Sequence, residues 1–477
     1  MTKGNKEQQR NIWNFIDCIE GDKVVLIVVL LLTLISALAI FSATSTLANG
    51  NKDRLDLIQD HAKFIGIGML LVYGIYKIKS IKWLRIPSQF GFAVSLALLL
   101  ILDCNINLGI IRPERLNDAG RTLNFLGFQI HVFEVTKVAM VMYFAWALHS
   151  YRQDCEAMEK GKKSPTFGIL NKLPLMIPSL EFLRRPIWKR IFYIYMPWVV
   201  SAALVLPGSN SSTLLIGGIC MLMLLIGRMP FKEIGIICCM GIIGLASCVG
   251  IYFASGKTVF ERMRFDELIT RLTADYSIER LIEIENDPKL GPKCKEWYEV
   301  RDEIKQPYSA KIAIHEGGFI GKLSGNSTQK YVTAHIYSDY MYSFIIEEYG
   351  LLGGIVILML FVSLLARGSL IAKLCQNDFA KYAVGGLSLL ISGQAFMHIC
   401  VNTGLFPMTG QTLPMISDGS FAFIMFCIAF GIILCISKMA KRQIREQEEA
   451  AAALYEKDKQ LDDIQSALSE VENIDNQ

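Results

Sequence analysis

The chain has 477 residues, of which 52% are hydrophobic and 19% charged, and its mean hydropathy is +0.37. A soluble domain carries about 25% charged residues, so this composition argues against an ordinary soluble protein. The net charge of +4 is small, and Lys and Arg cluster at the ends of apolar runs, which argues against a nucleic-acid partner.

The apolar residues come in runs of about 18–24, the length that a helix needs to cross a ~30 Å hydrocarbon core. These runs predict an all-α polytopic membrane protein with about ten spans. A polar segment, 1–22, precedes a first run that is too long for a cleavable signal, so we expect an uncleaved anchor. The predicted spans are 24–44, 60–77, 86–103, 133–149, 191–206, 212–227, 234–254, 341–366, 382–402 and 419–437.

Lys and Arg alternate in abundance between successive links, and this alternation predicts the orientation of the spans. The segment 150–190 carries nine of them, whereas the links 207–211 and 403–418 carry none. We therefore expect both termini in the cytoplasm, a membrane bundle over 23–437 and a charged cytoplasmic tail over 438–477. The long segment at about 255–340 then lies outside the cytoplasm, joining spans seven and eight.

Ionisable residues inside apolar runs are costly and therefore informative. Glu134 and Lys137 stand at i and i+3 in span four, so they share a helix face and can pair. We favour a functional role for this pair. For Gln394, His398 and Asn402 in span nine, hydrogen bonding between helices is an equally good interpretation. The twelve cysteines show no metal-binding spacing and are expected to act mostly as small apolar residues.

Three separated segments resemble the signatures of one family. NDAGRTLNFLGFQIHVFEVTKVAMV, at 117–141, is similar to the pattern NGAxRWL…QPSELAK. KIAIHEGGFIGKLSGNSTQK, at 311–330, and YSDYMYSFIIEEYG, at 337–350, are similar to AIxxGGxxGxGxGNSxQK…HTDFIFAIIxEExG. GLFPMTGQTLPMISDGS, at 404–420, is similar to GLLPVTGLPLPFISYGGS. The order of the segments fits the predicted topology, and the chain is identified as resembling the SEDS family (FtsW, RodA and SpoVE), nearest to its FtsW branch and to Bacteroidetes-type members.

The resemblance implies a peptidoglycan glycosyltransferase of the bacterial inner membrane. Such an enzyme polymerises lipid II during cell division: the 4-hydroxyl of an acceptor sugar attacks C1 of a donor sugar, and undecaprenyl diphosphate leaves. The implied partners are a class B penicillin-binding protein, which supplies the transpeptidase, and other membrane proteins of the divisome. Nothing in the chain resembles a nucleotide-binding loop, so the lipid-linked donor would supply the energy.

The resemblance also implies an essential Asp in the long outer segment, where this sequence departs from the family's DPxGxGYQ motif. Two candidates remain. Asp302, in VRDEIKQPYSAKIAI, has nearly the expected distance to the next motif but lacks the surrounding residues. Asp287, in NDPKLG, keeps the Asp-Pro pair but lies too early. We prefer Asp302, and an ordinary solvated loop carboxylate is the alternative for each.

The departing diphosphate needs positive charge from Arg, Lys or a divalent cation. Arg121 and Lys137 are the preferred groups, with Lys322 as a third, and Glu134 would hold Lys137 in place. Asp339 and Ser417 would shape the mouth of the cavity. The sequence identifies no definite cofactor. A divalent cation, Mg or Mn, is an optional participant that this chemistry allows.

Three alternative functions fit parts of the same pattern. A transporter or lipid flippase would also have broken helices and charges within the membrane, although no inverted repeat is visible. A non-catalytic division scaffold would explain the departure at the Asp motif. A RodA-like role in elongation would use the same chemistry at another place in the cell.

Overall fold

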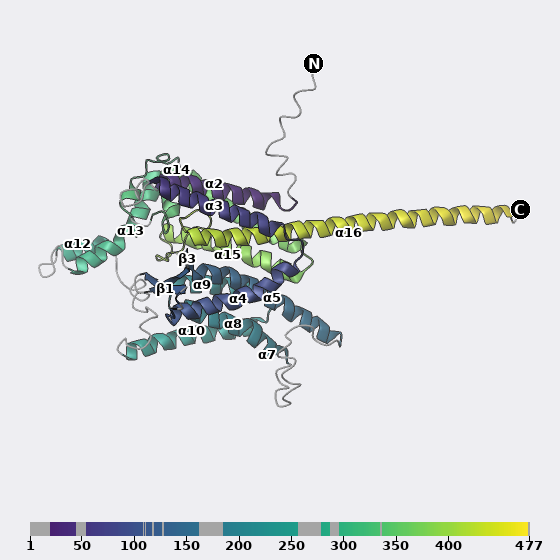
Figure 1. Cartoon of the computed structure of the whole chain (residues 1–477), viewed down its shortest axis with the longest axis horizontal. Coiled ribbons are helices and arrows are strands. Elements are labelled where there is room, and N and C mark those ends of the chain that lie inside the picture. The colour runs from purple at the N-terminus through teal and green to yellow at the C-terminus, as the bar shows by residue number, and fades with distance from the viewer. Residues whose placement is uncertain are drawn as a thin grey trace, which may run out of the picture.

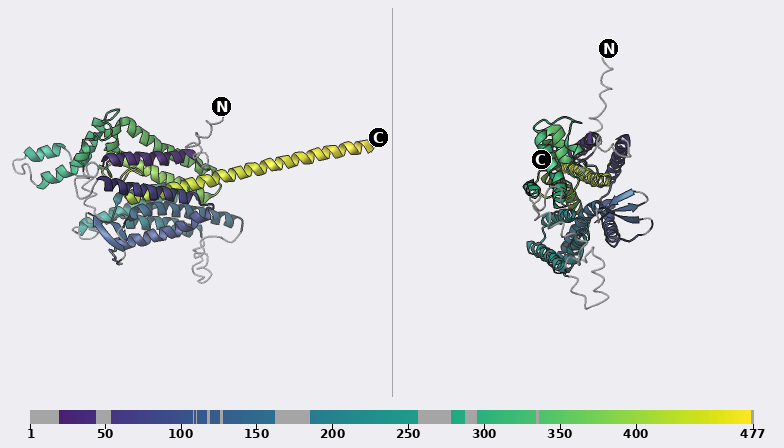
Figure 2. Two further views of the ribbon diagram at one scale, coloured as in Figure 1. Left: turned by 45° about the horizontal axis from the view of Figure 1, so that its top comes forward. Right: turned by 90° about the vertical axis from the view of Figure 1, so that its left-hand side faces the viewer.

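The computed structural model describes residues 20–43, 54–107, 109, 111–116, 119–125, 128–161, 185–255, 278–286, 295–333 and 336–475. Long helices run side by side as one bundle (Figures 1 and 2). The helices are α2 (Lys23–Ala43), α3 (Arg54–Tyr76), α4 (Lys82–Asp103), α5 (Val132–Glu159), α7 (Pro186–Arg190), the π-helix η3 (Ile191–Tyr195), α8 (Met196–Val205), α9 (Asn210–Ile226), α10 (Phe231–Ala254), α12 (Ile278–Asn286), α13 (Lys295–Gly317), the 3₁₀-helix η5 (Gln329–Tyr331), α14 (Met341–Leu374), α15 (Asp378–Asn402) and α16 (Ser420–Asp475).

The two ends of the bundle differ. One end bears α12, α13 and a small sheet, and we call it the loop end (Figure 1). From the opposite end, the tail end, the C-terminal part of α16 extends away from the bundle. Side chains at 445–460 of this extension are exposed, as expected of a charged tail.

Within the described residues, seven helices are long and apolar enough to cross a membrane: α2, α4, α5, α10, α14, α15 and α16. The other three predicted spans fall in α3, in η3 and α8, and in α9. The chain is thus a multi-pass helical membrane protein, as its apolar runs predict. The number of ten spans and the outward position of 255–340 stay predictions.

A three-stranded antiparallel sheet, which the apolar pattern does not predict, precedes α5. Its strands are β1 (Ile111–Leu116), β2 (Ala119–Phe125) and β3 (Phe128–His131), in the order β1-β2-β3. Figure 2 shows the sheet at the edge of the bundle. Because β3 runs directly into Val132, the sheet fixes where α5 begins and therefore where Glu134 and Lys137 stand.

The glycine-rich segment after α13 packs against a kink in α14. Gly350 has φ 71°, a left-handed conformation that glycine adopts without strain. Backbone hydrogen bonds interlock the two segments: Lys322 N–H donates to the Glu347 carbonyl at 2.9 Å, and Leu351 N–H donates to the Gly318 carbonyl at 2.9 Å. The glycines therefore allow two backbones to approach closely.

Gly317 makes the closest of these approaches, so a side chain there should destabilise the fold. A Cβ atom on Gly317 would lie 2.1 Å from the carbonyl oxygen of Ile346. We expect Gly317→Ala to cost about 1–3 kcal/mol or more through overpacking, seen as a lower apparent melting temperature in detergent. Gly385→Ala in α15 is the control, because its Cβ would meet no atom within 4 Å. Equal stability of both variants would contradict this packing.

Candidate active site

Lys137 is the centre of a buried polar cluster near the loop end. Its side chain is 1% exposed, and its Nζ donates to Glu134 Oε1 at 2.5 Å, Gln394 Oε1 at 2.7 Å and Gln411 Oε1 at 3.0 Å. The i, i+3 spacing in α5 thus gives the predicted ion pair. An ammonium group has three N–H donors, and all three are used. We call Glu134, Lys137, Gln394 and Gln411 the polar hub.

The link between α15 and α16 is fastened to the bundle through the polar hub. Gln411 Nε2 donates to the hydroxyl oxygens of Ser211 and Ser212, each at 3.0 Å, at the start of α9. Gln394 Nε2 donates to the Thr412 carbonyl at 3.0 Å. One buried cation therefore joins α5, α9, α15 and the Pro/Gly-rich link 403–419.

A chain of hydrogen bonds continues from the polar hub along α15. His398 Nδ1 lies 2.7 Å from the Gln411 carbonyl oxygen, and since a carbonyl only accepts, Nδ1 carries the proton. His398 Nε2 then accepts from the backbone N–H of Tyr342 at 3.4 Å. One turn later, Asn402 Oδ1 accepts from both the N–H and the hydroxyl of Ser343, at 3.0 and 2.9 Å.

The same chain reaches Asp339 and Ser417. Asn402 Nδ2 donates to the Asp339 carbonyl at 3.1 Å, and Ser338 Oγ donates to Asp339 Oδ1 at 2.8 Å. Ser417 Oγ donates to the Ser338 carbonyl at 2.9 Å. Four of the residues that the sequence selects, Glu134, Lys137, Asp339 and Ser417, thus belong to one connected network.

Lys322 lies in a separate cluster around Glu347. The buried Glu347 carboxylate accepts from Ser327 Oγ at 2.5 Å, from the Thr328 N–H at 2.8 Å and from Lys322 Nζ at 3.0 Å. Lys322 also pairs with Glu316, which lowers the pKa of Glu316 below its usual range. Two carboxylates already neutralise this lysine, so it fastens the glycine-rich segment to α14. Its role as a diphosphate ligand stays a prediction.

The remaining candidates are placed only by their backbone or not at all. Arg121 lies in β2 and Asp302 in α13, both at the loop end, and the side chains of both are outside the described residues. Asp287 lies outside the described residues altogether. Among the residues that the structure does describe, no three His, Cys, Asp or Glu side chains are grouped as metal ligands. The catalytic carboxylate and the cation therefore stay predictions.

Sequence reasoning missed Gln411 and the two serines of α9. Gln411 is the one amide side chain in the link 403–419, and that was the available signal. Ser211 and Ser212 follow Pro207 and Gly208 at the start of α9, and serines at a helix start usually read as capping residues. Their contact with Gln411 spans about 200 residues of sequence, which no local pattern reveals.

These features define a polytopic membrane protein with a buried, charged polar centre near one end of its helical bundle. Residues 22–442 match the FtsW/RodA/SpoVE family, described as a cell cycle protein, and the chain belongs to that family.

Two curated relatives align over most of the chain, and a third aligns over less than half of it. The probable peptidoglycan glycosyltransferase FtsW of Geobacter metallireducens is 24% identical over 88% of this chain and 95% of its own length. Stage V sporulation protein E of Bacillus subtilis is also 24% identical, over 88% and 98%. The probable peptidoglycan glycosyltransferase FtsW of Hahella chejuensis is 31% identical, but that alignment covers 44% of this chain and 53% of the relative.

Solved structures share the fold. A chain from a structure described as "Structural coordination of polymerization and crosslinking by a peptidoglycan synthase complex" matches with a TM-score of 0.56 and 15% identity, over 88% of this chain and 98% of its own. The rod shape determining protein RodA of Thermus thermophilus matches with a TM-score of 0.52 and 15% identity, over the same shares. At this identity the likeness supports the architecture alone.

Proposed function

We propose that this chain is a peptidoglycan glycosyltransferase that polymerises lipid II into glycan strands during cell division and releases undecaprenyl diphosphate. The observation that carries this proposal is the family match over residues 22–442. Relatives named as probable peptidoglycan glycosyltransferases FtsW, one of them aligned over 95% of its length, support it.

The reaction needs a base that takes the proton of the acceptor hydroxyl as its oxygen attacks C1. A carboxylate in this role contributes about 10²–10⁴ in rate. Asp302 is our first candidate: its backbone lies in α13, which is at the loop end and packs against α14. Asp287 is the second candidate.

The leaving diphosphate carries charge that the site must stabilise as the C1–O bond breaks. Arg121 and Lys137 are the proposed cations. All three donors of Lys137 are occupied, so direct contact with a phosphate oxygen would require the exchange of one amide oxygen, from Gln394 or Gln411, for that oxygen. Glu134 would keep the ammonium group oriented during this exchange.

Asp339 and Ser417 would shape the mouth of the cavity by holding backbone segments in place, without contacting the substrate. The Ser417 hydroxyl donates to the Ser338 carbonyl and so ties the residues before α14 to the link 403–419, and Ser338 Oγ in turn donates to Asp339 Oδ1. A divalent cation, Mg or Mn, could share the diphosphate charge with Arg121. Its removal by a chelator would test that requirement directly.

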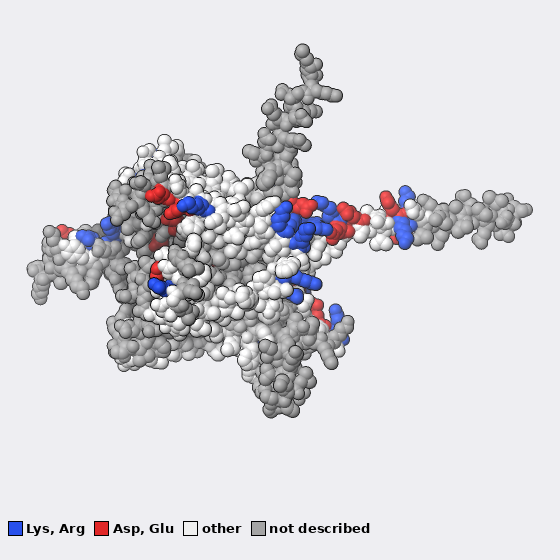
Figure 3. Space-filling view, in the orientation of Figure 1, with Lys and Arg blue, Asp and Glu red and all other residues white. Residues whose placement is uncertain are grey.

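The proposed partner is a class B penicillin-binding protein, with other membrane proteins of the divisome around it. The structural neighbour in a complex that couples polymerization to crosslinking supports such a pairing. We place the bundle in the bacterial inner membrane with both termini in the cytoplasm. The Lys and Arg residues at the tail end support this orientation (Figure 3).

The proposal is tested by incubating the purified full chain, with its transpeptidase partner, with lipid II labelled on its sugars. Polymerase activity yields glycan strands that a gel resolves by length. A parallel assay in vesicles follows lipid II from one leaflet to the other. Translocation with no polymer would favour a flippase and contradict the proposal.

A further inference from the structure

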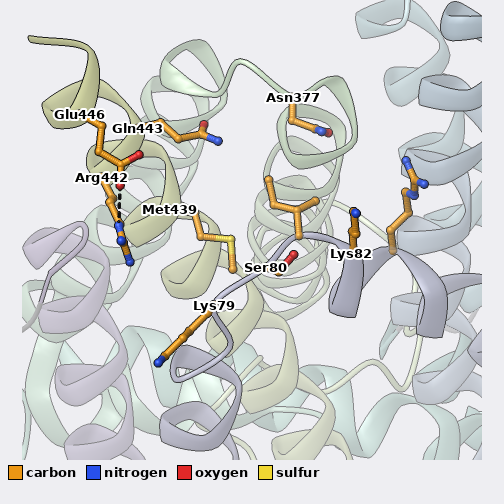
Figure 4. A pocket seen from close by; sticks show the side chains of 10 residues that line it. Lys79, Ser80, Lys82, Asn377, Met439, Arg442, Gln443 and Glu446 are labelled. Carbon is orange, nitrogen blue, oxygen red and sulfur yellow. Dashed lines mark hydrogen bonds and ion pairs between the residues drawn. The ribbon is translucent and has the colours of Figure 1, made fainter. Parts of the chain in front are cut away.

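A second polar pocket lies at the tail end, far from the polar hub. Its volume is about 480 Å³, and three segments line it: the residues around Lys79 and Lys82 before and at the start of α4, Asn377 before α15, and Met439–Glu446 on α16 (Figure 4). Arg85 of this pocket contacts His149 of α5 at 3.2 Å. His149 is twelve residues beyond Lys137, or about 18 Å along the helix, so the two polar sites are separate.

The lining of this pocket is strongly basic. It includes four cationic side chains, Lys79, Lys82, Arg85 and Arg442, against the single carboxylate of Glu446. Arg442 pairs with Glu446 at 2.8 Å (Figure 4). Within the described residues, no ion pair forms on Lys79 or Lys82. The pocket therefore holds an excess of positive charge that its own side chains do not neutralise.

The start of α4 adds to this positive potential. The first N–H groups of a helix have no partner within the helix and carry part of the helix dipole. Ile81, the N-cap residue of α4, has no side chain that could accept from them. At α15, by contrast, Asn377 Oδ1 accepts from the Phe379 and Ala380 N–H groups at 2.9 and 3.4 Å. At α4 the Trp83 N–H donates instead to the Ser80 carbonyl and the Leu84 N–H to the Ile81 carbonyl, so the helix dipole, rather than free N–H groups, adds positive potential here.

The outer face of α4 next to this pocket is apolar and exposed. Trp83, Ile86 and Phe90 stand at i, i+3 and i+7 and are 71%, 65% and 71% exposed. In a membrane-spanning helix such a stripe faces lipid, and Trp is typical of the level of the head groups. A ligand with an anionic head and apolar chains would fit the pocket and the stripe together.

We propose that this basic pocket binds the phosphate of an acidic phospholipid head group, with the acyl chains along Trp83, Ile86 and Phe90. Basic pockets between spans are typical sites for anionic head groups. A lipid head group and free inorganic phosphate both present a phosphate anion to the pocket, so the test must distinguish the two. The site would tie the start of α4 and the base of the α16 extension to one membrane leaflet.

The test uses the purified full chain in neutral detergent, titrated with phosphatidylglycerol and followed by native mass spectrometry. We expect Lys79→Gln/Lys82→Gln to weaken lipid binding about 30-fold. Each basic residue near an anionic surface typically contributes about 1 kcal/mol to binding, and the variant removes two of them. The matched control is Lys77→Gln/Lys373→Gln, which removes two charges at the same end from residues that do not line the pocket. Its affinity should stay close to wild type.

Two further arms distinguish the source of the phosphate. Phosphatidylcholine should bind far more weakly than phosphatidylglycerol, and inorganic phosphate should displace the lipid only at high concentration. Equal losses in the pocket variant and the control would show general surface attraction and overturn the proposal. Equal affinity for the two lipids, or full displacement by phosphate at the concentration of the lipid, would overturn it as well.

Discussion

Replacing Asp302 by Asn is expected to lower the rate of lipid II polymerisation about 10²–10⁴-fold while the protein keeps its wild-type melting temperature. The amide keeps the shape of the side chain but cannot take the proton of the attacking hydroxyl. Asp302 lies in α13, which packs against α14, the helix that the Asp339 region leads into. The measurement is the initial rate of strand formation by the purified chain with its partner.

Two further variants make this result specific. Asp287→Asn tests the second candidate in the same assay. Glu283→Gln is the control: this carboxylate lies on α12, also at the loop end, is exposed and pairs with Arg280 one turn earlier. A full rate in both Asp variants would show that neither is the base, and normal growth of a strain carrying both changes would favour the scaffold alternative.

The second large effect is expected at the polar hub. Lys137→Met leaves the mostly buried Glu134 carboxylate without its cation and two buried amide oxygens without a donor. Breaking a buried pair from one side costs about 3–5 kcal/mol. We expect a much lower apparent melting temperature and no polymerisation. The double variant Glu134→Gln/Lys137→Met should regain much of the stability, because no unpaired charge is left buried. It should not regain the activity, because the cation is missing.

Lys63 provides the matched control for this experiment. It also forms an i, i+3 ion pair, with Asp60 on α3 at 3.0 Å, but its side chain is 68% exposed. Exposed pairs contribute about 0–1 kcal/mol, so Lys63→Met should leave stability and activity near wild type. Our account of the polar hub fails if Lys137→Met proves as stable as Lys63→Met.

Local patterns account for the features that the sequence predicts correctly. Each predicted span coincides with a helix or a run of helices. A helix rises by a fixed distance per residue, so an apolar run long enough to cross the hydrocarbon core predicts a helix there. The Glu134–Lys137 pair follows from the same geometry. The charged tail continues as a helix after Lys438 because it is rich in residues with high helix propensity.

The features that were missed depend on contacts between distant segments. The strands before α5 are short and have no apolar alternation strong enough to predict a sheet. The polar hub joins Lys137 to Gln411, and Gln411 stands where the resembling pattern has Leu, so no motif points to it. Likewise, Glu348 accepts from Ser42 of α2, some 306 residues away.

The glycine-rich segment shows how a motif can be recognised while its role is not. The sequence identifies this segment by its resemblance to the family pattern, which does not say what its glycines do. In the structure they pass close to the backbone of α14, and Gly317, Gly321 and Gly350 have no room for a side chain. The same close approach pairs Lys322 with Glu347. The Lys322 N–H donates to the Glu347 carbonyl, and the Lys322 ammonium group donates to the Glu347 carboxylate.

The most direct test of the proposed function is the release of undecaprenyl diphosphate from lipid II by the purified full chain and its partner. The reaction frees one diphosphate for each glycosidic bond formed, so we predict that the leaving group and the polymer increase together. Release should stop with Asp302→Asn or Asp287→Asn, whichever residue is the base. Lipid II that stays intact under conditions in which the folded chain binds its partner would contradict the account.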